Sequence, residues 1–135
     1  MKKFLCIIVV LGVIVAKTVS SNTYEAETEK GRIKCISQYG WKVSEKIEEA
    51  VISIPKPLNL VYIRYNEIQK RAGFDISEYE GRKVCRYTYK VLNHSHKGDV
   101  YANIFVCDGK MIAADIMSRD IGGFMHEINR KEFIK

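Results

Sequence analysis

The centre of the fold is indicated by RKVCRYTYKVLNHSHKGDVYANIFVCDGKMIAADIMS, residues 82–118. Along most of it, apolar or aromatic residues alternate with polar ones, which is the two-residue period of a half-buried β-strand. Turn-forming residues divide the stretch into three predicted strands, at residues 82–92, 100–107 and 110–118. Asp108 and Gly109 join the last two strands, and this dipeptide is the strongest short-range signal for a β-hairpin. A three-stranded antiparallel sheet is therefore the expected centre of the fold.

Upstream of this sheet, the sequence predicts two helices separated by a short hairpin. The first helix is indicated by apolar residues at helical spacing and a closing Gly40, the apolar residues being Ile33, Ile36 and Tyr39. The hairpin should turn four side chains inward: Trp41, Val43, Ile52 and Ile54. The second helix should begin near Pro57 and carry an apolar stripe made of Leu58, Val61, Tyr62, Tyr65, Ile68 and Ala72.

The predicted order of elements is α-β-β-α-β-β-β. Elements that follow one another through short connections usually lie side by side, and adjacent strands flanked by helices indicate an α+β fold. We predict two helices packed on one face of a largely antiparallel five-stranded sheet. This single α+β domain should span residues 32–118, and residues 119–135 should form a C-terminal tail that packs on it.

The N-terminus has the pattern of an export signal. Two lysines precede an unbroken run of apolar or small residues, Phe4 to Ala16. As a helix this run would be about 20 Å long, short of the roughly 30 Å hydrocarbon core of a bilayer. We predict that residues 1–21 are a signal peptide or an uncleaved N-terminal membrane anchor, a buried core segment being the third alternative, and that residues 22–31 are a polar tether. The chain should then be exported, and either secreted or anchored facing the outside of the cell.

The charge of the chain gives little reason to expect a nucleic-acid partner. Its formal net charge is +6, and loss of residues 1–21 would leave 19 basic against 16 acidic residues, a net charge of about +3. A nucleic-acid partner would need a concentrated basic stripe. The densest basic run, Lys70-Arg71, ends the second predicted helix, where cations complement the helix dipole. The charge indicates ordinary solubility, with weak association to anionic envelope polymers as the alternative.

Three groups of segments carry a family resemblance: GWKVSEK at 40–46, YNEIQKRAGFDISEYEGRKV with RYTYKVLN at 65–93, and GGFMH at 122–126. They resemble an uncharacterised family of short exported proteins from Firmicutes, the domain of unknown function four-eight-three-zero. The resemblance covers about residues 33–126 and implies an exported bacterial domain, without implying an activity, ligand or catalytic residue. The chain departs from the family pattern in the 93–99 loop and in continuing past His126.

The histidines are the residues that could carry chemistry. His94 and His96 share a loop with Asp99, so imidazole and carboxylate ligands could form an open zinc or copper site there. The sequence contains no HExxH or CxxC spacing, and we expect a solvated turn that holds no metal. His126 has no identifiable acid or nucleophile beside it and is expected to be a packing or surface residue. Hydrolase and nucleotide-binding motifs are absent from the sequence, so we predict no catalytic residue and no cofactor.

The predicted strand registers divide the sheet residues between two faces. With Leu92 opposite Val100, one face holds the expected core: Cys85, Tyr87, Tyr89, Val91, Tyr101, Phe105, Cys107, Ile112, Ala114 and Ile116. The opposite face would offer a partner-binding surface made of Arg86, Lys90, Ile104, Val106, Met111 and Asp115. Lys90 and Asp115 would flank Ala102 at about 10 Å across three strands. Part of this apolar face should be covered by tail residues Ile121, Phe124, Met125, Ile128 and Phe133.

The same register places Cys85 directly opposite Cys107. Cross-strand Cβ atoms lie about 4.5 to 5.5 Å apart, and an oxidising exterior would allow a disulfide to form. Closing this loop would stabilise the fold by roughly 3 kcal/mol. Two free core thiols are one alternative, and a pairing that uses Cys35 is another.

The sequence favours a non-enzymatic binding or interaction module at the cell envelope. The export pattern, the missing catalytic constellation and the apolar second sheet face support this hypothesis. The partner would be an envelope molecule or protein, and the membrane would be met only through an uncleaved N-terminal segment. The alternative is a small envelope metal-binding protein or enzyme that uses the loop of His94 and His96.

Overall fold

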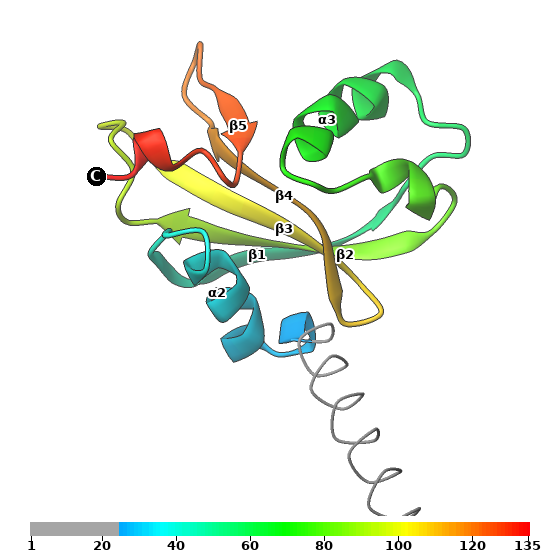
Figure 1. Cartoon of the computed structure of the whole chain (residues 1–135), viewed down its shortest axis with the longest axis horizontal. Helices are drawn as coiled ribbons and strands as arrows, with labels where there is room; N and C mark the ends of the chain where they lie inside the picture. The colour runs from blue at the N-terminus through cyan, green and yellow to red at the C-terminus, as the bar shows by residue number, and fades with distance from the viewer. Residues whose placement is uncertain (1–24) are drawn as a thin grey trace, which may run out of the picture.

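The computed structural model describes residues 25–135 and is built around one open antiparallel sheet (Figure 1). The α-helices are α2 (Glu29–Ser37) and α3 (Leu60–Arg71). The strands are β1 (Val43–Ser53), β2 (Lys83–Val91), β3 (Val100–Cys107), β4 (Lys110–Ser118) and β5 (Met125–Glu127). The short 3-10 helices are η1 (Glu25–Glu27), η2 (Ile76–Tyr79) and η3 (Lys131–Phe133). The predicted signal peptide or anchor, residues 1–21, lies outside the described residues, as does the start of the predicted tether.

The α+β fold with two helices and a five-stranded antiparallel sheet is confirmed. The strands lie in chain order, β1-β2-β3-β4-β5. One detail differs, because the predicted hairpin at 41–54 is the single strand β1, and the fifth strand is β5 in the C-terminal tail. The polar residues expected to form the turn, Ser44 to Lys46, stay within β1, where register shifts on either side of Lys46 fit them against β2. Within residues 25–135, no helix is long and apolar enough to span a bilayer.

Asp108 and Gly109 form the predicted turn between β3 and β4. Both residues have positive φ, 51° and 73°, as a two-residue type I′ turn requires. Cys107 therefore pairs with Lys110 next to the turn. A bulge between Phe105 and Val106 then shifts the β3–β4 register by one residue.

The β2–β3 register differs by one residue from the predicted one. Val91, and not Leu92, opposes Val100. The β2–β3 loop starts one residue early because the chain after β2 bonds to the segment before β1. The Leu92 N–H donates to the Lys42 carbonyl at 2.8 Å, and the Asn93 side-chain oxygen accepts from the Lys42 N–H at 2.8 Å. Successive strand residues point to opposite faces, so this slip exchanges the predicted faces of β3 relative to β2.

The predicted placement of both helices on one face is wrong: the helices lie on opposite faces of the sheet (Figure 1). Tyr89 and Ile116 share one face, since both oppose Ala102 in register, and on that face Arg32 of α2 donates to the Tyr89 hydroxyl at 3.1 Å. Asp115, one residue before Ile116, points to the other face and accepts a hydrogen bond from Tyr65 of α3. The prediction rested on the order of the elements and their short connections, and these do not determine which face of the sheet a helix covers.

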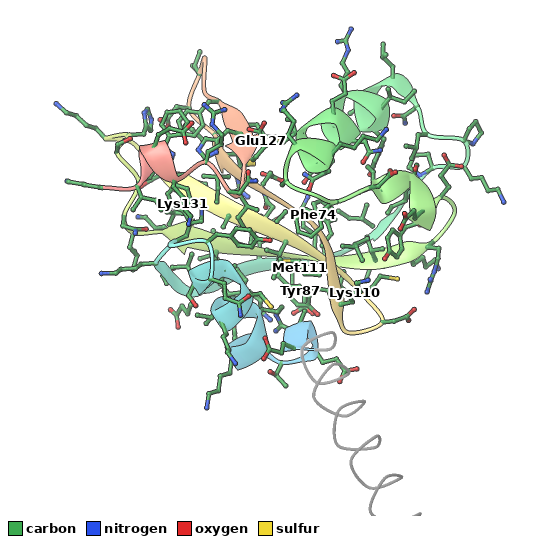
Figure 2. The ribbon with its side chains drawn as sticks, viewed as in Figure 1. Phe74, Tyr87, Lys110, Met111, Glu127 and Lys131 are labelled. Carbon is green, nitrogen blue, oxygen red and sulfur yellow. The ribbon has the colours of Figure 1, made fainter. Side chains whose placement is uncertain are left out.

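The main core lies between α2, the sheet and the C-terminal tail. Its largest buried side chains are Ile36, Trp41, Tyr89, Ile104, Ile116 and Ile128. Tyr87 and Met111 pack against this cluster (Figure 2). On the α3 face, a smaller cluster contains Ile54, Val84, Cys107 and Ile112. From the tail, Phe124, Ile128 and Phe133 join the main core, whereas Ile121 and Met125 are exposed.

Candidate functional site

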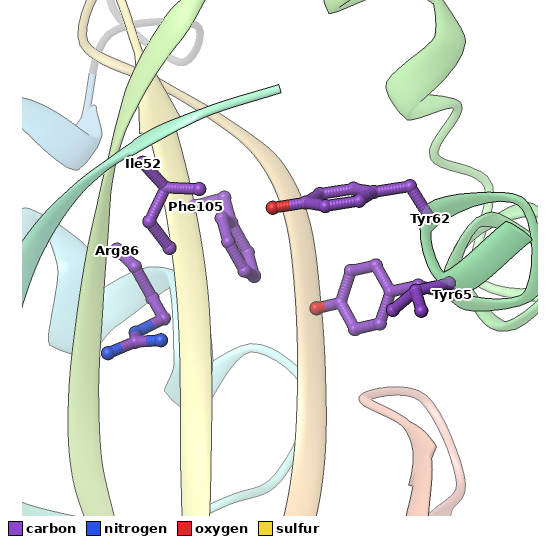
Figure 3. A pocket seen from close by; sticks show the side chains of 6 residues that line it. Ile52, Tyr62, Tyr65, Arg86 and Phe105 are labelled. Carbon is purple, nitrogen blue, oxygen red and sulfur yellow. The ribbon is translucent and has the colours of Figure 1, made fainter. Parts of the chain in front are cut away.

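An apolar pocket opens between α3 and the neighbouring half of the sheet (Figure 3). Its volume is about 190 Å³. Strands β1, β2 and β3 contribute one residue each and α3 contributes three: Ile52, Arg86, Phe105, Val61, Tyr62 and Tyr65. The pocket lies where α3, which packs against β4 and β5, leaves the β1–β2 side of this face uncovered.

Two side-chain amides hold α3 in this position. The buried Gln69 accepts from the backbone N–H of Ala114 in β4 at 2.9 Å, so the helix is bonded to the sheet. Asn66, also buried, donates to Asp75 at 2.8 Å and accepts from the Ile76 N–H at 2.8 Å. These contacts hold α3 through the side that faces the protein interior. The apolar residues on its other side stay exposed beside the pocket.

Ring packing and hydrogen bonds hold the wall of the pocket on the α3 side. The Tyr65 ring packs edge-on against Phe105 with 5.7 Å between ring centroids, and its hydroxyl donates to Asp115. Asn103 also donates to Asp115, at 3.1 Å, and accepts from the Thr88 hydroxyl at 2.7 Å. Burial raises the pKa of Asp115 to about 6, although both hydrogen bonds favour its charged form, and burial also raises the pKa of Tyr65 well above its usual value.

The opposite wall carries a cation. The Nη2 atom of Arg86 donates to Glu48 of β1, and Glu48 also accepts from Arg119 at 2.9 Å. The hydrogen bond from Arg119 is the largest cause of a lowered pKa at Glu48, so the carboxylate stays charged. The Nε atom of Arg86 is buried, and no acceptor in the part of the chain that the structure describes bonds to it.

The residues predicted to form one partner-binding surface are divided between the two faces. Ile104 and Val106 are buried in the main core, and Met111 packs against them on the α2 side. Arg86 and Asp115 lie on the α3 face, where Arg86 lines the pocket and Asp115 is buried behind its wall. Lys90 does not flank Ala102 together with Asp115, because it opposes Tyr101 and pairs with Asp99 at 3.2 Å.

Of the pocket residues, only Arg86 was predicted to bind a partner. The sequence pattern assigned Val61, Tyr62 and Tyr65 to the buried stripe of a helix, and Ile52 and Phe105 to the core. The apolar period shows that a helix packs on something, but it does not show how much of the sheet that helix covers. Arg86 occupies a polar position of the alternating strand, as Thr88 and Lys90 do, so the sequence contains no signal that distinguishes it as a pocket residue.

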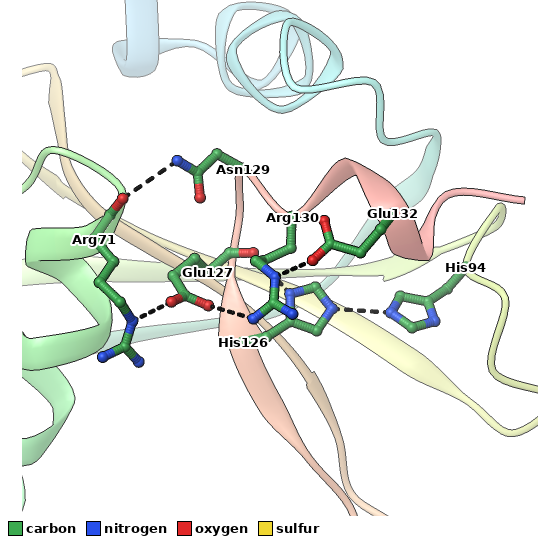
Figure 4. A network of polar contacts seen from close by, with 7 residues as sticks. All are labelled: Arg71, His94, His126, Glu127, Asn129, Arg130 and Glu132. Atoms are coloured by element: carbon green, nitrogen blue, oxygen red, sulfur yellow. Dashed lines mark hydrogen bonds and ion pairs between the residues drawn. The ribbon is translucent and has the colours of Figure 1, made fainter.

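The histidines form a second constellation (Figure 4). The Nε2 atoms of His94 and His126 are 3.0 Å apart, Nδ1 of His94 accepts from the His96 backbone N–H at 3.0 Å, and Nδ1 of His126 lies 2.7 Å from the Glu127 carbonyl oxygen. These partners assign the tautomers: His94 carries its proton on Nε2 and donates to His126, which carries its own on Nδ1. Two neutral rings thereby satisfy every ring nitrogen.

Aromatic rings enclose this histidine pair. His94 stacks on Trp41, Phe124 and Phe133, with centroid distances of 5.4, 5.1 and 5.6 Å. Burial lowers the pKa of His94 to about 4 and also lowers the pKa of His126. The pair therefore joins the β2–β3 loop to the C-terminal tail as a neutral packing element.

The three residues predicted as weak metal candidates do not converge. His94 points into the aromatic cluster, His96 pairs with Asp120 at 3.1 Å, and Asp99 pairs with Lys90. Among the residues 25–135, no group of three or more His, Cys, Asp or Glu is arranged to hold a metal ion.

Of the three alternatives for the cysteines, the structure contradicts the possible disulfide between Cys85 and Cys107. Cys85 opposes Val106, so Cys107 points to the other face of the sheet. Cys35, Cys85 and Cys107 are all free thiols. The error has the same cause as the exchanged faces, since a shift of one residue in the β2–β3 register separates the two sulfur atoms.

Together, the open sheet with a helix on each face and the pocket beside α3 define a small α+β domain with a candidate binding site. The chain belongs to the family described as a domain of unknown function, DUF4830, whose model matches residues 35–116. All six pocket residues lie within that range, whereas His126 and Phe133 lie beyond it. Comparison with curated proteins and with solved structures gives no match.

Proposed function

We propose that this protein is a non-enzymatic binding module and that the pocket beside α3 anchors an apolar side chain of a protein partner. The observation that carries the proposal is the apolar pocket itself, which opens to solvent between Ile52, Val61 and Phe105. At about 190 Å³ it is smaller than the roughly 300–1,000 Å³ of typical small-molecule sites. Its size suits one side chain, as in the anchor pockets of protein interfaces.

The surroundings of the pocket also favour a macromolecular partner. Leu60, Val61 and Ile63 lie exposed on α3, the helix that forms one wall of the pocket. Clustered apolar residues on a surface are typical of interaction sites, and one small ligand would leave most of them in water. A partner that inserts one residue into the pocket could cover the apolar residues along its rim as well.

We further propose that the module is exported and meets its partner at the cell envelope. The support is the sequence of residues 1–21, a basic start followed by an apolar run. Mass spectrometry of the native protein should find either an N-terminus near Asn22 or a full-length chain in the membrane fraction. A full-length chain in the soluble cytoplasmic fraction would refute export.

Methyl NMR tests the pocket directly. We expect 3-methylbutan-1-ol, added to the protein with its natural N-terminus, to shift the methyl signals of Ile52 and Val61 and few others. Val61→Trp should abolish these shifts at Ile52, because the indole would fill or cover the pocket.

Leu60→Trp is the matched control for this experiment, since Leu60 is also exposed on α3 but does not line the pocket. This variant should keep the Ile52 response. Shifts scattered over the whole surface, or an Ile52 response that survives Val61→Trp, would exclude the pocket as a binding site.

A further inference from the structure

We propose that the pocket recognises the C-terminal residue of its partner, with an apolar side chain in the pocket and the α-carboxylate on Arg86. This inference rests on the proposed function and adds the chemical class of the group that is bound. It identifies Arg86 as the residue that determines specificity.

The first argument is the orphaned donor in the pocket wall. A guanidinium has five N–H donors, and a buried donor without an acceptor is costly because it has lost its water. The Nε atom of Arg86 is buried, and no described residue accepts from it, while Nη2 is engaged by Glu48. Nε itself is enclosed, so an oxygen of a bound partner can reach only the exposed part of the guanidinium, the Arg86 side chain being 28% exposed. A carboxylate oxygen there would form a strong, charge-assisted bond and stabilise a guanidinium that lacks an acceptor at Nε.

The second argument is the charge around the pocket. Arg86 and Arg119 share the single carboxylate of Glu48, so Glu48 does not neutralise both guanidinium groups, and the buried Asp115 interacts with Arg86 as well. Asp115 lies behind the Tyr65 hydroxyl and is buried, so it is not presented to the pocket. An anionic group therefore complements the wall formed by Arg86.

The third argument concerns distance and selects the C-terminal residue. Arg86 itself lines the small pocket, so the carboxylate must lie within one residue of the inserted apolar side chain. In an extended segment, the side chain of an adjacent Asp or Glu points to the opposite side, and the next residue on the same side is about 6.6 Å away. A C-terminal aliphatic residue avoids both problems, because its carboxylate and its side chain share one Cα atom.

The test is a pair of NMR or calorimetric titrations with N-acetyl-L-leucine and N-acetyl-L-leucinamide, which differ only in the carboxylate. The protein is used with its natural N-terminus. We expect the acid to bind at least tenfold more tightly than the amide. Arg86→Met should remove this difference, with the affinity for the amide changed by less than about threefold, since a charged hydrogen bond is lost while the apolar contacts remain.

Three further variants make the result specific. Arg119→Met is the matched control, because it also removes a partner of Glu48 but does not line the pocket, and it should preserve the preference for the acid. Glu48→Gln should strengthen binding of the acid, since it releases Arg86. If Arg86→Met fails to fold, Arg86→Lys keeps the charge without the planar guanidinium and should still reduce the preference by at least threefold.

The possible failures can be told apart. Equal affinities for acid and amide, with shifts at Ile52 and Val61, would overturn the role of Arg86 and leave the apolar pocket standing. A preference for the acid that survives Arg86→Met would also overturn it. Absence of any response at Ile52 and Val61 to either compound would overturn the proposed function as well.

Discussion

At the scale of single residues, His94 shows how a polar side chain becomes part of a core. Its ring lies among Trp41, Phe124 and Phe133, and both ring nitrogens have partners only while the ring is neutral. A proton added to Nδ1 would face the His96 backbone N–H, which already donates to that atom. Burial and hydrogen bonding thus oppose protonation together, and this explains the low pKa of His94.

This arrangement predicts a pH-dependent stability. The pKa of His94 is about 4 in the fold and about 6.5 in the unfolded chain, so the unfolded state binds more protons between these values. Stability is then full above pH 6.5 and falls as the pH drops toward 4, with a loss of about 2 kcal/mol at pH 5 from this residue. Urea unfolding at a series of pH values measures how steeply the free energy of unfolding changes with pH.

Two variants assign that slope. His94→Phe should reduce it between pH 6.5 and 5, leaving the part that the lowered pKa of His126 contributes. The variant starts less stable because His126 and the His96 N–H lose a partner. His96→Gln should retain the slope, since His96 is partly exposed and pairs only with Asp120. The raised pKa of Asp115 acts in the opposite direction, adding stability as the pH falls below 6. An unchanged slope in His94→Phe would refute the assignment.

At the scale of the elements, the sequence predicted most of the strands and both helices, because these depend on local periodicity and turn chemistry. Asp108-Gly109 set the β3–β4 turn through its own backbone preference. The β2–β3 register was not accessible in this way, since it depends on how Leu92 and Asn93 bond to Lys42, about fifty residues earlier in the chain. One residue of error then exchanged the faces and paired the wrong cysteine.

The orientation of α3 escaped prediction for a related reason. The predicted apolar stripe included Leu58, Val61 and Ile68, but the fully buried positions of the helix are the polar Asn66 and Gln69. Gln69 is buried because its oxygen satisfies the Ala114 N–H of β4, which lies beyond the three residues of that strand that pair with β5. A buried amide that replaces a missing strand partner leaves no periodic signal. The pocket beside α3 was therefore missed along with the rotation of the helix.

At the scale of the whole molecule, the C-terminal tail completes the fold. β5 pairs with β4 over Asp115 to Met117, and the Trp41 Nε1–H donates to the Ile128 carbonyl at 2.6 Å. The tail thereby connects β4 to the segment between α2 and β1, where Trp41 lies. The family match ends at residue 116, so this closure lies outside the matched region.

We therefore predict that alanine substitutions at two tail isoleucines, seven positions apart, change the free energy of unfolding by different amounts. Ile128 is fully buried in the main core, with 0% of its surface exposed, whereas Ile121 is fully exposed. Ile128→Ala should lower the free energy of unfolding by about 2–5 kcal/mol, through lost burial and the cavity that remains. Ile121→Ala, the same chemical change on the surface, should alter it by less than about 0.5 kcal/mol. Urea denaturation of both variants at pH 7 measures the difference. Equal and small effects would mean that the tail does not contribute to the core, whereas the expected contrast would show that residues beyond the matched region stabilise the whole domain.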